Sequence, residues 1–187
     1  VEFLEHEYAN VHRGTHILSR KATERFEEAY YIVADYLGAE LKNGAICFTQ
    51  NTTQALDLAG HVMAGLPGKI ITTEMEHHSN LVPWQLIAKG TGATLKFAAI
   101  TDDGRLDLRS FKAQLGGRTK VVAVTLMSNV LGTINPIKRI MHAARKKGAL
   151  VLIDAAQSAP QLTVDVQVGD CDFLALSAHK MLGPTGV

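Results

Sequence analysis

Short apolar runs recur along the chain and alternate with longer amphipathic segments. The runs are rich in Val and Ile and lack the polar alternation of half-exposed strands, so the pattern predicts strands that are covered on both faces. They span residues 45–49, 70–73, 95–100, 121–126, 150–153 and 173–176.

Helices are predicted between most of these strands. Ser19 is placed to cap a helix in which apolar residues recur at spacings of three and four as far as Leu37, and Gly38 ends it. Asn135 and Pro136 predict a cap followed by a proline at the first helical position. The other helical patterns cover residues 53–64, 79–89, 107–115 and 136–147.

The alternation of strands and helices predicts one α/β domain with three αβα layers, in which helices cover both faces of a mostly parallel sheet. With 187 residues, 47% of them hydrophobic, the chain is long enough for a sizeable core. The net charge of +1 does not indicate a nucleic-acid partner, and no apolar run approaches the roughly 18 residues of a membrane span. The two cysteines form no paired motif, which fits a reducing, cytoplasmic compartment.

Polar residues follow the predicted strands. Because ligands of parallel α/β sheets bind beyond the carboxyl ends of the strands, we expect these residues to converge at one edge. They comprise a helix start that is suited to bind an anion, a histidine pair, an amide, a carboxylate and a lysine. In chain order these groups fall at residues 50–53, 74–78, 128–129, 154–157 and 177–180.

Each of these groups also has a simpler interpretation when it is taken alone. Asn51, Thr52 and Thr53 at a helix start suit a phosphate, but N-capping is the commoner use of such residues. Asp154 could cap a turn, pair with a basic side chain or hold a protonated heteroaromatic nitrogen. His77 could stack on a ring and carry a proton, or merely cap a turn; metal binding is not favoured, since His77 and His78 share no helix face.

Lys180 would ordinarily be a solvated loop lysine. Here it follows a strand of the buried type and lies beside Ser177 and His179. A lysine in a partly desolvated site can form a Schiff base with a carbonyl group. A carbonyl cofactor that also carries a phosphate and a pyridinium nitrogen would use the lysine, the carboxylate and the helix start together. The convergence therefore indicates pyridoxal phosphate.

Several long stretches resemble the class V aminotransferase family of fold-type-I pyridoxal-phosphate enzymes, most closely its cysteine desulfurase and selenocysteine lyase branch. The EHHSNLVPWQ and VHRGTH stretches favour this branch over other members. The matching stretches are ANVHRGTHILSRKAT (9–23), FTQNTTQALDL (48–58), TEMEHHSNLVPWQ (73–85), VTLMSNVLGTINPI (124–137), VLIDAAQSAP (151–160) and LSAHKMLGPTGV (176–187).

The resemblance implies a role for each matching residue. Lys180 would form the Schiff base and remove the Cα proton, Asp154 would keep the ring nitrogen protonated, and His77 would stack on the ring and act in acid–base steps. Gln157 would contact the phenolic oxygen, and Asn129 the substrate carboxylate or that oxygen. Thr53, Ser177 and His179 would bind the phosphate, with Thr52 adjacent. His12, Arg13 and His16 match a segment near the mouth of the site, where His12 and Arg13 would contact the substrate.

The implied reaction converts L-cysteine, or selenocysteine, to L-alanine and passes sulfur through an enzyme persulfide to an acceptor protein, as in iron–sulfur cluster assembly. Family members are homodimers whose partner subunit completes the phosphate site. The nucleophilic cysteine and the arginine that binds the substrate carboxylate lie well beyond the lysine in this family. Neither Cys47 nor Cys171 matches the nucleophile motif, and both are expected to be buried apolar residues.

We therefore expect residues 1–187 to be the pyridoxal-phosphate-binding large domain of a cysteine desulfurase, without its N-terminal segment and its C-terminal small domain, and inactive by itself. Two alternatives stay open at this point. One is a non-catalytic fragment that keeps the fold. The other is a different class V enzyme, such as a selenocysteine lyase or an amino-acid epimerase.

Overall fold

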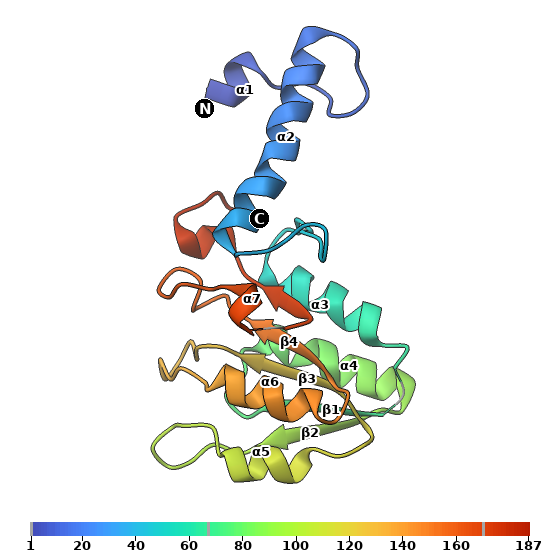
Figure 1. Cartoon of the computed structure of the whole chain (residues 1–187), viewed down its shortest axis with the longest axis vertical. Coiled ribbons are helices and arrows are strands. Elements are labelled where there is room, and N and C mark those ends of the chain that lie inside the picture. The colour runs from blue at the N-terminus through green and yellow to red at the C-terminus, as the bar shows by residue number, and fades with distance from the viewer. Residues whose placement is uncertain (1, 67, 170) are drawn as a thin grey trace. The chain divides into compact units, whose positions relative to one another are not determined.

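The structure is a computed structural model that describes residues 2–66, 68–169 and 171–187. Its contacts divide the chain into two compact units, with the boundary between Ile46 and Cys47. Figure 1 labels the helices and strands of both units. The first unit is helical, whereas the second carries the sheet.

The long helix of the first unit is α2 (Ile17–Tyr36), which follows the short helix α1 (Glu2–His6). Its N-cap is His16, whose ring accepts a hydrogen bond from the backbone N–H of Ser19 (3.3 Å). The prediction that Ser19 is the cap is therefore wrong: Ser19 is buried inside the first turn, and its hydroxyl donates to the carbonyl of Asn10 (2.6 Å). Gly38, with φ of 65°, ends the helix as predicted.

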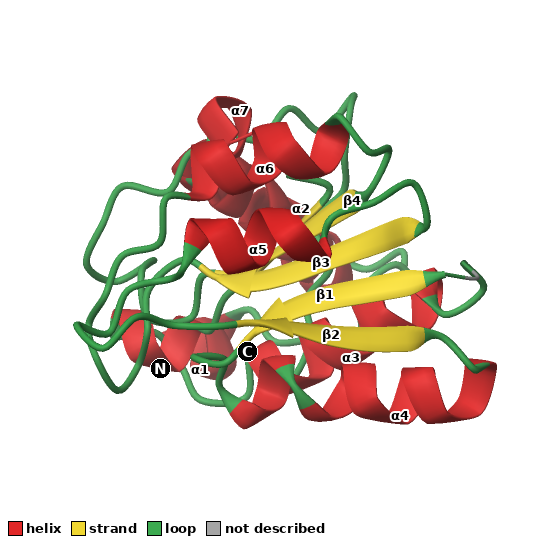
Figure 2. Cartoon of the chain, turned by 90° about the horizontal axis from the view of Figure 1, so that it is seen from below, coloured by secondary structure: helices red, strands yellow, loops and turns green. Residues whose placement is uncertain are grey.

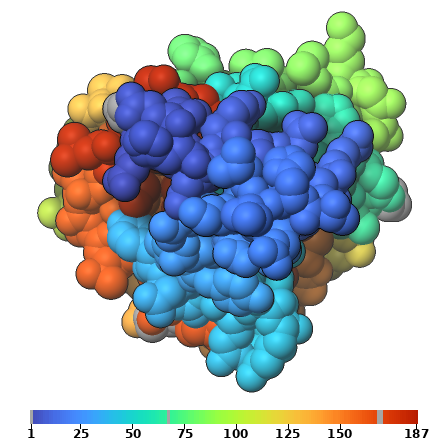
Figure 3. Space-filling model, turned by 90° about the horizontal axis from the view of Figure 1, so that it is seen from above, coloured from blue at the N-terminus to red at the C-terminus, as the bar shows by residue number. Residues whose placement is uncertain are grey.

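The first unit exposes many large apolar side chains. Figure 3 shows this unit in dark to light blue. Within α2, the buried residues are Ser19, Ala22 and Ala34, which are all small. The apolar spacing therefore identifies the helix but does not correspond to a large core within this unit. The exposed side chains include Leu4, Tyr8, Ile17, Tyr31 and Ile32.

The described part of the second unit contains a five-stranded sheet in which every pair of neighbours is parallel. The strands lie in the order β2-β1-β3-β4-β5. This arrangement confirms the predicted α/β fold. The bounds are β1 (Lys69–Thr73), β2 (Thr94–Ala98), β3 (Thr119–Thr125), β4 (Leu150–Asp154) and β5 (Phe173–Ala175).

Helices cover both faces of the sheet (Figure 2). One layer contains α3 (Thr52–Met63) and α4 (Val82–Thr91), and the other contains α5 (Leu108–Gln114) and α6 (Ile137–Arg145). Each matches a predicted helix to within a few residues. The shorter elements are η1 (His78–Asn80), α7 (Val166–Gly169) and η2 (Ala178–Met181), of which α7 and η2, like α1, were not predicted.

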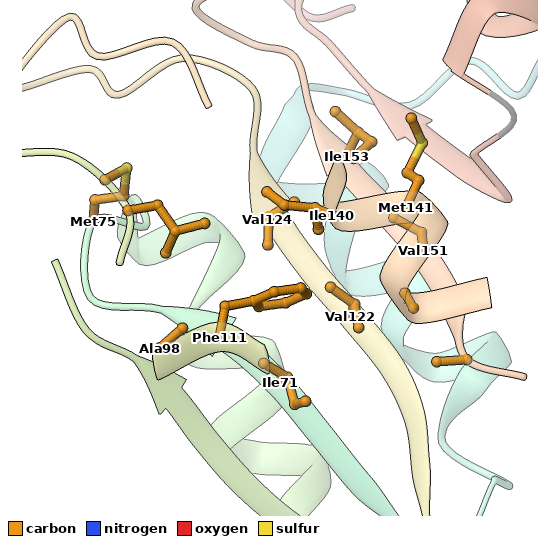
Figure 4. Close-up of a cluster of buried hydrophobic side chains, with 13 residues drawn as sticks. Ile71, Met75, Ala98, Phe111, Val122, Val124, Ile140, Met141, Val151 and Ile153 are labelled. Carbon is orange, nitrogen blue, oxygen red and sulfur yellow. The ribbon is translucent and has the colours of Figure 1, made fainter. Parts of the chain in front are cut away.

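The core has two halves because successive residues of a strand point to opposite faces of the sheet. On one face, Phe111 of α5 and Ile140 of α6 pack against the strands (Figure 4). On the other face, Leu56 of α3 and Trp84 of α4 do so. The strand residues are Ile71, Val122 and Ile153 on the first face and Ile70, Val121 and Leu152 on the second.

Two strand predictions need correction. Residues 45–49 form no strand, because a strand requires main-chain hydrogen bonds to a neighbour and this segment pairs with none of the described strands. Cys47 is accordingly exposed rather than buried, and Cys171 is only partly buried. The run 95–100 forms β2, but Lys96 and Phe97 are exposed, since β2 lies at the edge of the sheet.

The predicted cap of α6 is also wrong. The helix has Pro136 as its N-cap, with no hydrogen bond from a side chain. The side chain of Asn135 instead donates to the carbonyl of Thr125 (2.8 Å) and to the sulfur of Met75 (3.1 Å). Asn135 thus ties the start of α6 to the end of β3. No helix among the described residues has the length and apolar character to span a membrane.

The packing predicts the effect of removing a core ring. Phe111 is 0% exposed, so Phe111→Ala should lower the free energy of unfolding by about 3–5 kcal/mol, which includes the cost of the cavity left behind. Urea unfolding followed by circular dichroism measures this loss. Leu86→Ala, at an exposed position of α4, is the control and should change it by less than about 0.5 kcal/mol. Equal losses in the two variants would contradict the packing described here.

Candidate active site

A cavity of about 340 Å³ opens where the carboxyl ends of the strands meet the start of α3. Its lining belongs entirely to the second unit. His12 and Arg13 lie in the first unit, and their substrate role stays a prediction. Of the predicted site residues, the cavity brings together Thr52, Thr53, His77, Asn129, Asp154, Gln157, Ser177, His179 and Lys180.

Asp154 is the last residue of β4 and is only 4% exposed. Its Oδ1 accepts a hydrogen bond from the backbone N–H of Ala156 (2.9 Å). Burial raises the pKa of Asp154, whereas this hydrogen bond and the nearby charge of Lys180 lower it. A buried carboxylate that borders a cavity is suited to pair with a cationic group of a ligand.

The start of α3 is held to the loop after β5. Asn51 is the N-cap, and its side chain accepts from the backbone N–H of Gln54 (3.0 Å). The backbone N–H of Thr52 donates to the hydroxyl of Ser177 (3.1 Å), and the two hydroxyls also share a short hydrogen bond. Asn51 therefore caps the helix, whereas Thr53 lines the cavity, and the role of this segment toward a phosphate stays a prediction. The N-terminus of a helix favours an anion such as phosphate.

His77 both caps a turn and lines the cavity. Its Nδ1 accepts a hydrogen bond from the backbone N–H of Ser79 (3.2 Å) at the start of η1. A ring nitrogen that accepts from an N–H carries no proton of its own, so the proton of the neutral ring is on Nε2. The hydroxyl of Ser79 lies 3.0 Å from this Nδ1 and 2.7 Å from the hydroxyl of Thr53. Ser79 therefore connects the histidine to the helix start.

Lys180 lies in η2, directly after β5, and its backbone N–H donates to the carbonyl of Ser177 (3.3 Å). Lys180 is exposed although it lines the cavity, so the partial desolvation expected from the sequence is not observed. The turn closes through Gly183, whose N–H donates to the carbonyl of Ala178 (2.8 Å). A Cβ at Gly183 would lie 2.9 Å from that oxygen, so only glycine fits there.

Some residues at or beside the cavity were missed by the sequence analysis. Ser79, Thr125 and Met127 line it, and Glu76, which directly precedes His77, has a buried carboxylate that accepts a hydrogen bond from Thr125. The signal for Glu76 and Ser79 was their place in the polar segment after β1, beside a histidine already singled out. Thr125 gave no such signal, because a β-branched residue at the end of an apolar run resembles any other strand residue.

The donor set fits pyridoxal phosphate. The carboxylate of Asp154 suits the pyridinium nitrogen, the amine of Lys180 suits the aldehyde, and the start of α3 with Ser177 suits the phosphate. Within residues 2–66, 68–169 and 171–187, no group of three or more His, Cys, Asp and Glu side chains is arranged to hold a metal ion.

Comparison with known proteins places the chain among related sequences and structures. The model of the aminotransferase class-V family matches residues 1–187. The chain is 45% identical over 194 residues to a probable cysteine desulfurase of Streptomyces coelicolor, and 47% identical over 190 residues to a cysteine desulfurase of Dickeya dadantii. It is aligned over its whole length in both cases but spans only 46% of each relative.

Solved structures of cysteine desulfurases also resemble this chain. The apo structure of a cysteine desulfurase from Thermococcus onnurineus NA1 superposes with a TM-score of 0.90 at 43% sequence identity. The match covers 99% of this chain and 46% of that one. The comparison confirms the predicted fold class, that of the large domain of a fold-type-I enzyme.

The raised pKa of Asp154 predicts a pH dependence of stability. A carboxyl group with a raised pKa in the folded state stabilises that state fully below its unfolded pKa of about 4, and this contribution is lost as pH rises through the folded pKa. Asp154→Asn keeps an acceptor for Ala156 and does not titrate. Without added cofactor, the variant should therefore become more stable relative to wild type as pH rises from about 4. Urea unfolding over this range measures the difference, and a difference independent of pH would contradict the assignment.

Proposed function

This chain belongs to the aminotransferase class-V family, and we propose that it is the cofactor-binding large domain of a pyridoxal-phosphate-dependent cysteine desulfurase. The observation that carries the proposal is the convergence of Lys180, Asp154 and the start of α3 on one cavity. The names of the relatives at 45% and 47% identity support the choice of reaction.

The cofactor is held by groups that face the cavity. Bound pyridoxal phosphate supplies an aldehyde that reacts with primary amines and a ring that accepts electrons. Asp154 keeps a proton on the ring nitrogen, because an ionised carboxylate beside it stabilises the cationic form. The start of α3, with Thr52 and Thr53, binds the phosphate together with Ser177 and His179.

The remaining side chains act on the substrate. The Nζ atom of Lys180 would hold the cofactor through its aldehyde and would act as the general base that accepts the proton from the substrate Cα. His77 carries its proton on Nε2 and serves in the acid–base steps. Gln157 contacts the phenolic oxygen of the cofactor, and Asn129 contacts the substrate carboxylate or that oxygen.

Sulfur transfer needs a cysteine other than the two in this chain. Cys47 is exposed, Cys171 is partly buried, and neither is among the described residues that line the cavity. We place the persulfide cysteine in a small domain outside these 187 residues. His12 and Arg13 contact the substrate. The protein acts as a cytoplasmic homodimer that passes sulfur to an acceptor protein for iron–sulfur cluster assembly.

Replacing Lys180 tests the proposed reaction. In the full-length protein, Lys180→Ala should abolish the visible absorbance that lysine-bound pyridoxal phosphate gives. It should also lower the formation of alanine and sulfide from L-cysteine by at least about 100-fold, since a positioned general base contributes about 10²–10⁴ in rate. Lys89→Ala, at an exposed position of α4, is the control and should leave both unchanged.

Three outcomes would overturn the proposal. Wild-type protein that gives no such absorbance does not bind the cofactor through this site. Wild-type rates in Lys180→Ala would exclude the lysine from the reaction. D-cysteine in place of alanine and sulfide would identify an epimerase instead.

A further inference from the structure

Glu76 lies directly beside His77, and its carboxylate is buried although the residue as a whole is partly exposed. Oε1 accepts hydrogen bonds from the hydroxyl of Thr73 at the end of β1 (2.6 Å) and from the backbone N–H of Thr125 at the end of β3 (3.0 Å). Oε2 accepts from the side-chain amide of Asn80 in η1 (2.6 Å). The carboxylate therefore joins two strand ends to the turn that His77 begins.

The network continues into the core through Asn80. Its Oδ1 accepts a hydrogen bond from the indole N–H of Trp84 (3.1 Å), and both residues are 0% exposed. The backbone N–H of Asn80 donates to the carbonyl of His77 (2.8 Å). Asn80 thus fixes the turn, because its backbone N–H bonds to His77 and its side chain bonds to Glu76 and Trp84.

The donor and acceptor pattern restricts what residue 76 can be. Because Asn80 uses its oxygen for Trp84, only its NH₂ group faces Glu76, and residue 76 must offer an acceptor there. Burial raises the pKa of Glu76 to about 8, and the nearby charge of Asp154 also raises it, whereas its three hydrogen bonds lower it. A buried carboxyl group costs free energy, and its hydrogen bonds offset that cost while they hold the turn after β1 in one geometry.

We infer that Glu76 is a positioning residue of the proposed cofactor site, which holds His77 at the cavity by tying the turn after β1 to the end of β3. The inference deepens the proposed function and rests on it for the role of His77. The hydrogen bonds of Glu76 itself do not depend on a cofactor, so the two ideas can fail separately.

Four variants of the full-length protein separate positioning from general stability. Glu76→Gln sets an NH₂ group opposite either the NH₂ group of Asn80 or, if the glutamine turns, the backbone N–H of Thr125, and turning the asparagine only moves the clash to Trp84. Asn80→Asp alone sets two carboxylates opposite each other. The pair Glu76→Gln and Asn80→Asp restores donor to acceptor throughout and, above about pH 8 where Glu76 is ionised, keeps the charge of wild type. Glu74→Gln is the matched control, because Glu74 is exposed and accepts from the backbone N–H of Ile100 (3.2 Å), as an amide oxygen also can.

The first measurement uses protein without cofactor. The ring ¹⁵N signals of His77, assigned with a His77→Gln variant, should shift in Glu76→Gln, return in the double variant and stay unchanged in Glu74→Gln. Trp84 is the only tryptophan among these 187 residues. In a form of the full-length protein that keeps Trp84 as its single tryptophan, the fluorescence emission of Trp84 shows whether each variant keeps a folded core. An unshifted His77 signal in folded Glu76→Gln would overturn the inference.

The second measurement is the dissociation constant for pyridoxal phosphate. Glu76→Gln should weaken binding by about tenfold, as expected when a buried donor is left unpaired, and the double variant should recover most of this loss. In a His77→Ala background, Glu76→Gln should change the constant by less than about twofold, because the effect passes through His77. A tenfold loss in that background would overturn the inference. If wild type binds no cofactor, the proposed function fails, and the histidine signals still decide the role of Glu76.

Discussion

The pairing of β4 with its two neighbours sets the position of Asp154, and the rest of the site is arranged around that carboxylate. Asp154 lies opposite Thr125 of β3 and Ala175 of β5 in the parallel register. A slip of one residue would turn every side chain of β4 to the other face of the sheet. Because Leu152 and Ile153 are buried in opposite halves of the core, such a slip would disrupt both halves. Core packing thus fixes the register of β4 and, with it, the position of the Asp154 carboxylate.

Two carboxyl groups with raised pKa values lie close together at this edge of the sheet, and their hydrogen bonding differs. Glu76 receives hydrogen bonds on both oxygens from described residues, whereas Asp154 receives one, from Ala156. A carboxylate satisfied by the protein can organise a turn, and one that is only half satisfied can pair with a ligand. The same residue type therefore has a structural role at one position and a binding role at the other.

Much of this arrangement could be predicted from the sequence, because strands buried on both faces and helices between them leave clear patterns. The runs that became β1, β3 and β4 are rich in Val, Ile and Leu and contain no charged residue, and the polar residues that follow them were expected to converge. Residues 45–49 look the same locally, but they pair with no described strand, and pairing is not a local property. The cap of α2 was missed because histidine is an unusual cap, and the network of Glu76 because its partner Thr125 lies 49 residues away.

The covalent attachment point of the cofactor decides whether this cavity binds pyridoxal phosphate through Lys180. Full-length protein loaded with pyridoxal phosphate can be reduced with borohydride, digested and examined by mass spectrometry. The account predicts that the reduced pyridoxyl group is found on the peptide that contains Lys180. Its presence on a different lysine, or its absence from every lysine, would contradict the account.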